Sequence, residues 1–268
     1  MEPIERGLAL LYNPEYAAGN HGQVPSLDDA QRVLSRIVRT AQITVGITGE
    51  VDAGEMVERA GAMLGELAWR EGDAGAAGKL ELSAQGDRTC EIELVAGEPK
   101  QVSGVLGGSV EDLATLRATI LASMVLGERV RAAVEQHGYE ASVDVQVVTS
   151  DSLRDRWALL FLVEGSGDDA VMGLVRDVAD EMLSEGIGFD ELDPIKADLD
   201  QMLGHYARSA RYWSTRLSGV GLNGRTIEDV WSVRAGYAAV DADAATMALR
   251  SALGGGQRFA IRVHPQDQ

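Results

Sequence analysis

The four histidines are the side chains of this chain best suited to metal chemistry, because imidazole is the commonest metal ligand in proteins. They are His21, His137, His205 and His264, and no two lie four residues apart, the spacing that puts two ligands on one helix face. His137 is followed by Glu140, but position 141 is an alanine. A catalytic zinc site usually needs at least three protein ligands in fixed geometry. The sequence therefore predicts no metal-binding residue and no catalytic residue in this chain.

Cys90 is the single cysteine of the chain, so no intrachain disulfide can form. A thiol can act as a nucleophile, but Cys90 lies in the alternating segment RTCEIELV beside Glu91 and Glu93. Neighbouring carboxylates raise the pKa of a thiol and so disfavour the reactive thiolate. We therefore interpret Cys90 as a strand residue, and no arrangement of Ser, Cys and His supports an independent hydrolase. The glycine-rich segments 105–110 and 253–259 match no dinucleotide or phosphate motif and are interpreted as turns.

The hydrophobic pattern shows helices and strands in separate runs rather than in strict alternation. Apolar residues at spacings of three and four predict helices at 26–40, 54–68, 168–185, 190–217 and 242–253, and two helical segments between 110 and 136. Alternating or β-rich runs predict strands at 43–48, 80–82, 90–95, 101–106, 141–148, 157–163 and 259–263. Residues 1–20 are only weakly patterned. This order predicts an α+β fold in which an antiparallel sheet packs against a helical layer.

The charge of the chain limits the kinds of partner. Its 42 acidic residues outnumber the 24 Lys and Arg, which gives a formal net charge of −18. Such a surface repels nucleic acid and anionic membranes. No apolar run reaches the roughly 18 residues that a membrane span requires, and the first residues are acidic where a signal peptide is basic. We therefore expect a cytoplasmic protein, or a periplasmic one if the chain is a fragment of a longer exported protein.

Taken together, the predicted elements resemble the C-terminal, non-catalytic half of the pitrilysin/insulinase-like zinc metallopeptidases, which include the mitochondrial processing peptidases. The segments that carry the resemblance are WALLFLV at 157–163, the helix at 168–185, GFDEL at 188–192, the helix through Tyr212 and Trp213, and RFAIRVHP at 258–265. Upstream, ITVGITGEVDAGEMVERAGAMLGEL at 43–67 is similar to the unit that closes one repeat of the family. The resemblance implies a metallopeptidase-like domain preceded by part of a second, similar repeat.

This resemblance also predicts the domain boundaries. It implies a partial repeat at 1–69, a linker in the small, polar, glycine-rich segment 70–79, and a pitrilysin-like C-terminal domain at 80–268. The first part carries the late helix, strand and helix of a repeat but lacks its opening elements. We therefore expect an apolar face that a partner or a second copy of the chain covers.

The zinc motif of the family, H-x-x-E-H, is absent from the sequence. The resemblance thus implies that zinc is held only by a partner half or subunit. Family members grip the peptide with an arginine and a tyrosine in the pattern L-R-x-x-x-x-G-x-x-Y-S, and aligning Gly138 with this pattern puts Ala141 at the tyrosine. Arg129, Arg131 and Tyr139 lie close enough in sequence to bind peptide instead. The alternative is that both arginines are solvated residues of a helix surface.

Two classes of function follow from the resemblance. In the first, the chain is a non-catalytic domain or subunit that closes the chamber of a zinc metallopeptidase and binds peptide, so that it is active only with a catalytic partner. In the second, it is a degenerate scaffold or interaction protein of the same fold with no role in proteolysis.

Overall fold

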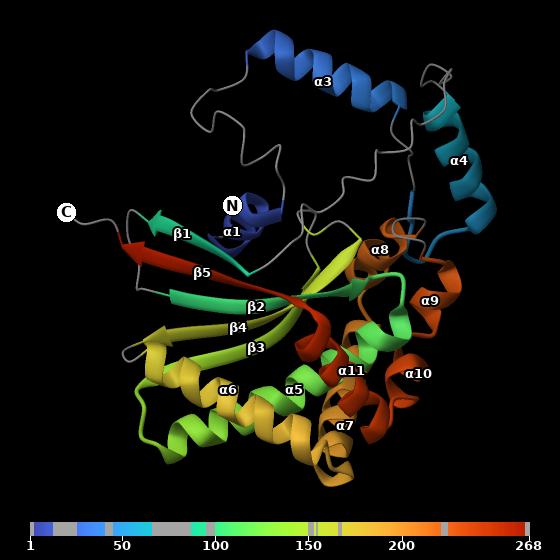
Figure 1. Cartoon of the computed structure of the whole chain (residues 1–268). Helices are drawn as coiled ribbons and strands as arrows, with labels where there is room; N and C mark the ends of the chain where they lie inside the picture. The colour runs from blue at the N-terminus through green and yellow to red at the C-terminus, as the bar shows by residue number, and fades with distance from the viewer. Residues whose placement is uncertain are drawn as a thin grey trace. The chain divides into compact units, whose positions relative to one another are not determined.

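The computed structural model contains a mixed sheet of five strands, in the order β1-β5-β2-β4-β3 (Figure 1). The strands are Arg88–Leu94 (β1), Lys100–Ser109 (β2), Ala141–Thr149 (β3), Arg156–Gly165 (β4) and Gln257–Pro265 (β5). Strand β2 pairs antiparallel with β4 and β5, and β3 pairs antiparallel with β4. Strand β5 instead pairs parallel with β1. The predicted α+β fold is confirmed, and the sheet is antiparallel except for this one pair.

The structure describes residues 3–12, 26–40, 45–65, 87–94, 100–149, 153, 155–165, 168–220 and 225–265. These residues belong to two compact units, each treated by itself below. Unit 1 consists of Met1–Ala18, Leu82–Met202 and Ser232–Gln268, and unit 2 consists of Gly19–Glu81 and Leu203–Trp231. Within the described part of the chain, no helix has the length and apolar character needed to cross a membrane.

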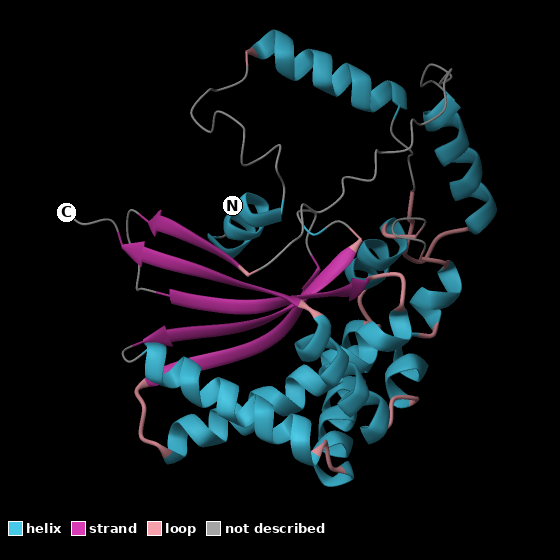
Figure 2. Ribbon diagram, viewed as in Figure 1, coloured by secondary structure: helices cyan, strands magenta, loops and turns pink. Residues whose placement is uncertain are grey.

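The sheet of unit 1 carries helices on both faces (Figure 2). The helices of this unit are Pro3–Tyr12 (α1), Leu113–Gln136 (α5), Asp168–Glu185 (α6), Phe189–Tyr206 (α7, up to Met202), Val233–Ala238 (α10) and Ala242–Gly255 (α11). Helix α5 packs on β3, α6 on β4 and α11 on β2, which forms the thick helical layer. The opposite face is covered by α1, which packs on β1 and β5.

Alternation along the strands supplies both faces of the sheet with apolar side chains. On β4, Ala158 and Leu160 lie in the same buried cluster as residues of α1, so the alternating Trp157, Leu159 and Phe161 face the opposite layer. The cluster beneath α1 consists of Leu8, Leu11, Tyr12, Ile92, Val102, Leu106, Leu153, Ala158, Leu160, Phe259, Ile261 and Val263. Both faces of the sheet are therefore part of the hydrophobic core.

Local capping explains where the main helices begin and end. The Asp112 carboxylate accepts a hydrogen bond from the Thr115 amide at 3.1 Å and begins α5, which is one helix rather than the two predicted segments. Asp241 caps α11 in the same way through the Ala244 amide at 2.7 Å. Gly186, with φ +88°, closes α6 in the left-handed conformation that glycine adopts readily. The last carbonyls of α6 thereby gain a partner, because the Gly186 amide donates to the Met182 carbonyl at 2.9 Å.

Unit 2 contains four helices among the described residues and no strand. They are Leu27–Thr40 (α3), Ala53–Gly65 (α4), Ala210–Ser218 (α8) and Ile227–Trp231 (α9), with the last turn of α7. Residues 45–48 of the predicted strand 43–48 are irregular. The prediction of one long helix at 190–217 is also wrong. Helix α7 ends at Tyr206, and Ser209 adopts an extended conformation before α8 begins. The Trp213 indole N–H donates to the Ala207 carbonyl at 2.7 Å and satisfies the broken end.

The predicted domains, at 1–69 and 80–268, do not contain the same residues as the two compact units. The linker at 70–79 and the strand at 80–82 lie outside the described residues. Helix α1, which falls in the predicted partial repeat 1–69, packs in the core of the sheet that belongs to the predicted domain 80–268. The boundaries therefore stay a prediction, while the packing of α1 is a feature that the weak pattern of residues 1–20 did not indicate.

Candidate functional site

Arg129, one of the three predicted peptide-binding residues, is engaged within the protein. It lies on α5 and forms a two-point ion pair with Glu191 of α7, with Nε to Oε1 at 2.6 Å and Nη2 to Oε2 at 2.7 Å. Nη2 also donates to the Gly186 carbonyl at 3.0 Å. The side chains of Arg129 and Glu191 are only 22% and 30% exposed. This geometry joins the start of α7 to α5 and engages Nε and Nη2 of the guanidinium group within the protein.

The same contact shifts both pKa values. The hydrogen bond from Arg129, helped by one from the Gly188 amide, lowers the pKa of Glu191 despite its partial burial. The hydrogen bond to Glu191 raises the pKa of Arg129. The charged forms of both residues are thus favoured in the folded state.

We expect Glu191→Gln to remove a pH-dependent part of the stability. Because the folded-state pKa of Glu191 lies below its unfolded value of about 4.3, its contribution is fully present above that value and is lost as the pH falls through the folded-state pKa. The substitution should lower the free energy of unfolding by about 1–2 kcal/mol at pH 7 and by much less at pH 3. Urea unfolding at both pH values measures this. Glu185→Gln is the control, since Glu185 lies 4.0 Å from Arg129 and is mostly exposed; equal losses in the two variants would contradict the assignment.

The other two predicted peptide-binding residues, Arg131 and Tyr139, contact residues close to them in sequence. Arg131 is exposed and pairs with Glu128 at 2.6 Å along the surface of α5. Tyr139 lies in the turn between α5 and β3, where its ring stacks on His137 with centroids 6.2 Å apart. Among the described residues, no hydrogen bond or ion pair joins Arg129, Arg131 and Tyr139 to one another. Peptide binding by these three residues stays a prediction.

The residues considered for metal or thiol chemistry are dispersed. His137 caps the end of α5, with Nδ1 2.8 Å from the Ala133 carbonyl oxygen, at the predicted helix-to-strand junction. Cys90 lies in β1 as predicted, and burial, followed by the charge of Glu91, raises the pKa of its thiol against the opposing effect of Arg6. In the part of the chain that the structure describes, no three His, Cys, Asp or Glu side chains gather in a group that could hold a metal ion.

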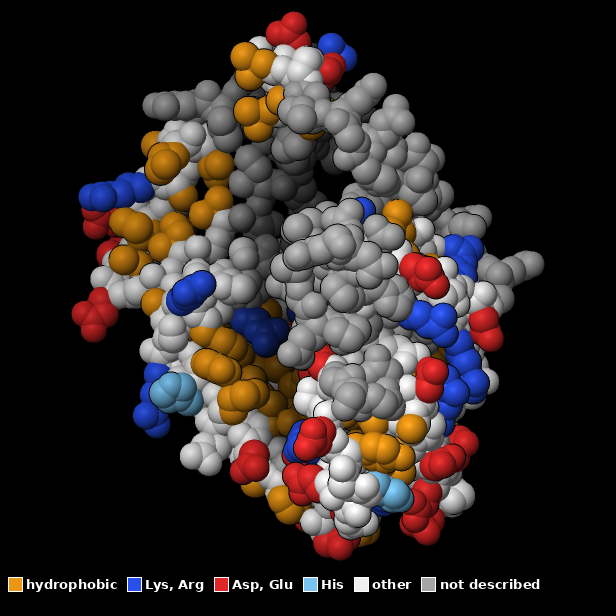
Figure 3. Space-filling model, turned by 90° about the vertical axis from the view of Figure 1, so that its left-hand side faces the viewer, with side chains coloured by type: hydrophobic (Ala, Val, Ile, Leu, Met, Phe, Trp, Pro, Cys, Tyr) orange, Lys and Arg blue, Asp and Glu red, His pale blue; other side chains and the backbone are white. Residues whose placement is uncertain are grey.

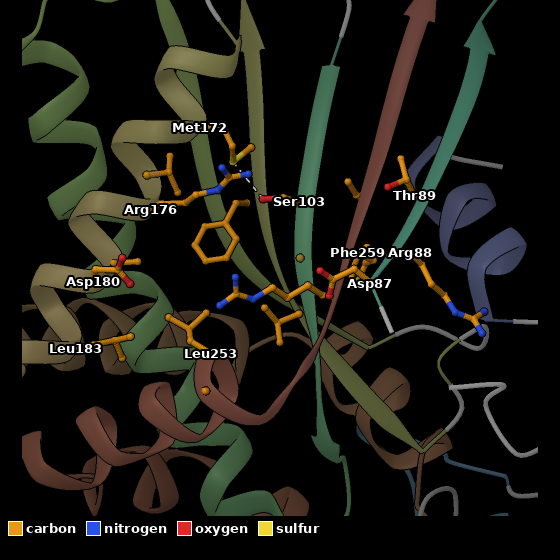
Figure 4. A pocket seen from close by; sticks show the side chains of 18 residues that line it. Asp87, Arg88, Thr89, Ser103, Met172, Arg176, Asp180, Leu183, Leu253 and Phe259 are labelled. Atoms are coloured by element: carbon orange, nitrogen blue, oxygen red, sulfur yellow. Dashed lines mark hydrogen bonds between the residues drawn. The ribbon is translucent and has the colours of Figure 1, made fainter. Parts of the chain in front are cut away.

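A pocket of about 620 Å³ lies in unit 1 between α6 and the strands β1, β5 and β2, and is called the α6–β5 pocket below. Figure 4 shows Met172, Arg176, Asp180 and Leu183 along one wall of the pocket, on successive turns of α6. The residues that line it are Asp87, Arg88, Thr89, Ser103, Gly104, Val105, Phe161, Met172, Val175, Arg176, Ala179, Asp180, Leu183, Leu253, Gly254, Arg258, Phe259 and Ala260. Figure 3 shows this side of the molecule, where hydrophobic side chains and a Lys or Arg side chain lie in a hollow. The pocket is a candidate site among the described residues.

Two of the lining residues turn their side chains elsewhere. Arg88 points toward α1 in Figure 4, donates to the Leu11 carbonyl and lies over the Tyr12 ring, 5.8 Å from its centroid. Phe259 is buried and meets Tyr12 edge to face, with ring centroids 5.6 Å apart. The positive charge available to the pocket therefore comes from Arg176 and Arg258.

No pattern in the sequence indicates this pocket. Arg176 and Asp180 lie in a predicted helix with the spacing of a solvated charged face, and Arg258 follows a glycine-rich segment interpreted as a turn. Their proximity depends on β5 lying between β1 and β2, which no local pattern indicates.

The fold has clear relatives among solved structures, although no protein-family model and no curated protein match the sequence. The peptidase M16 inactive domain from Pseudomonas fluorescens is similar over 99% of this chain and 65% of its own length, with a TM-score of 0.74 and 17% identity. A protease from Helicobacter pylori matches 81% of this chain and 54% of its own, with a TM-score of 0.67 and 13% identity. The periplasmic protease PqqL from Escherichia coli matches 81% of this chain and 25% of its own, with a TM-score of 0.63 and 16% identity.

These similarities show the fold of M16/insulinase-family peptidase domains and confirm the family resemblance at the level of structure. The chain spans less than two thirds of the length of each of these three proteins. At such low identity the likeness concerns the fold alone.

Proposed function

We propose that this chain is a non-catalytic M16-type domain that completes the chamber of a zinc peptidase and contacts its peptide substrate. The observation that carries the proposal is the match over 99% of the chain to a structure described as a peptidase M16 inactive domain. The absence of H-x-x-E-H from the whole sequence supports it, since the two histidines and the glutamate of that motif hold zinc and activate water. In this proposal zinc is held by the catalytic half, and the complex is cytoplasmic.

The test is reconstitution with an M16-type protein that carries H-x-x-E-H and is encoded beside this chain. We expect neither protein alone to cleave an unstructured peptide well, and the mixture to cleave it roughly 100-fold faster, because closure positions the substrate and excludes water. A partner with the motif glutamate changed to glutamine is the control and should stay inactive in the mixture. Stoichiometric zinc and cleavage in this chain alone would overturn the proposal.

A second candidate function, a scaffold without a role in proteolysis, is favoured by the apolar surface of unit 2. Leu27, Val33 and Leu34 of α3 and Val57 and Met63 of α4 are all exposed large hydrophobic residues. Several large apolar side chains exposed on neighbouring turns of a helix are typical of surfaces that associate with another protein. Mixtures that show no cleavage, together with concentration-dependent association of the chain in light scattering, would support the scaffold instead.

A further inference from the structure

We infer that the α6–β5 pocket binds the C-terminal end of a peptide whose last residue is apolar. The inference rests on the proposed function only for the choice of a peptide as ligand. The pocket itself is defined by residues of unit 1, away from the predicted peptide-binding residues Arg129, Arg131 and Tyr139, none of which lines it.

The apolar part of the pocket suits a large hydrophobic side chain. Val175 and Phe161 are buried residues of its wall, and Leu183 and Leu253 lie at one end in Figure 4. A volume of about 620 Å³ falls within the range of small-molecule sites and exceeds what one side chain fills, so part of the adjoining peptide backbone fits as well. Burial of an aromatic or aliphatic terminal residue would supply most of the affinity.

The charged part of the pocket suits a single carboxylate. Arg176 comes from α6 and Arg258 from β5, and neither has a hydrogen bond or an ion pair to any residue that the structure describes. A guanidinium group matches a carboxylate in a two-point geometry, and two unpaired guanidinium groups on an apolar pocket favour an anion with an apolar body. The chain has a net charge of −18, so the two arginines are not part of a general basic surface.

A hydroxyl group on the floor adds a further donor. Ser103 Oγ lies 3.1 Å from Met172 Sδ, and a thioether is a weak acceptor. The hydroxyl can therefore turn to a carboxylate oxygen at little cost. In Figure 4 the Arg176 side chain extends from α6 in the direction of Ser103 and Met172, and all three residues line the pocket.

Asp87 and Asp180 restrict the ligand further. Both line the pocket and, like the two arginines, have no partner among the described residues. Carboxylates on the wall repel a ligand with a second negative charge and favour amide N–H groups or a basic residue upstream of the terminus. The pocket should therefore reject peptides that carry an acidic residue next to the last position.

Calorimetry on the isolated chain tests the inference with an acetylated hexapeptide that ends in phenylalanine and carries one lysine. We expect the free-acid peptide to bind and its C-terminal amide to bind at least about tenfold more weakly, since a charge-assisted hydrogen bond is lost. Arg176→Gln and Arg258→Gln should each weaken binding roughly fivefold to tenfold. For a peptide in which alanine replaces the lysine, Asp180→Asn should leave binding unchanged or tighten it, because the carboxylate then has no basic group of the ligand to attract.

The matched control is Arg262→Gln. Arg262 lies on the same strand and face as Arg258 but outside the pocket, paired with Glu91 at 4.0 Å. Equal binding of acid and amide, equal losses for Arg258→Gln and Arg262→Gln, or no binding of the free acid would each overturn the inference. Decanoate that displaces the peptide and binds as tightly would identify a fatty carboxylate rather than a peptide as the ligand. Because no catalytic partner is present, failure here and failure of the reconstitution are separate results.

Discussion

Replacing Gly107 by alanine should lower the free energy of unfolding by about 3 kcal/mol, because the new methyl group would overlap a buried aromatic ring. A Cβ at position 107 would fall within contact distance of three ring carbons of Trp157, which is only 2% exposed. The ring cannot move easily, since it is packed between the sheet and the helical layer. In thermal unfolding the expected shift of the midpoint is roughly 5–10 °C downward.

Gly108→Ala is the control for this prediction. It is the next residue in β2 and is exposed, and its added Cβ would approach the Trp157 Nε1 atom only to 3.8 Å, an ordinary contact. The cost should stay below about 0.5 kcal/mol. If both alanine variants unfolded at the same temperature, the close packing of Trp157 on β2 would be refuted. The register of β2 and β4, which pairs Leu106 with Ala158, brings Gly107 opposite Trp157.

The second large effect concerns α1, where Leu8→Ala should destabilise unit 1 by about 3 kcal/mol. Leu8 is fully buried in the cluster beneath α1, with Ile261 and other residues of the sheet. The substitution leaves a cavity between the helix and the sheet that neither element can close. Chemical unfolding monitored by tryptophan fluorescence, to which the buried Trp157 contributes, would measure the loss.

Leu27→Ala makes the same chemical change at a residue of α3 that is 73% exposed, and its cost should be within about 0.5 kcal/mol. A loss of similar size in both variants would mean that α1 does not pack on the sheet. A selective loss in Leu8→Ala would establish that residues 3–12 fold with unit 1, against the grouping of residues 1–69 that the family resemblance predicted.

Helix α1 also illustrates what the sequence could and could not predict. Its apolar residues Ile4, Leu8, Leu11 and Tyr12 have helical spacing, but a ten-residue helix with a glycine in it is marginal by itself. The helix depends on β1 and β5, which are distant in sequence. Gly7 permits this packing, because a Cβ there would lie 2.7 Å from the Ile261 side chain. The sequence thus shows the helical spacing of α1, but it does not show that the helix is stabilised by packing on β1 and β5.

The elements from α5 to β5 were predicted more completely, because their periodic patterns are long and their ends carry local caps. The helix at 168–185 and the strands β3 and β4 fall almost where alternation and spacing put them. The end of α7 at Tyr206 was missed, because the apolar spacing continues through it. The hydrogen bond from the Trp213 indole to the Ala207 carbonyl, which helps to close this end, is not visible in the spacing.

The candidate site was the least predictable part. Its two arginines come from a helix and from a strand that are joined through the whole of α7 to α11 in sequence. Periodicity predicts which face a residue occupies, but it does not predict which faces of distant elements meet. The three residues that the family pattern suggested lie instead around α5, with Arg129 held in an intramolecular ion pair.

The position of β5 has a consequence for how the chain acquires its structure during synthesis. This strand is the last described element, yet it separates β1 from β2, so β1 has no neighbour in the sheet until residues 257–265 have left the ribosome. A nascent chain that stops before them has an open gap in its sheet, with the apolar side chains of β2 uncovered and two unpaired strand edges. Pairing between segments so far apart in sequence is slow. The sheet of unit 1 is therefore completed only after β5 has been synthesised, and until then the edge of β2 that pairs with β5 is open.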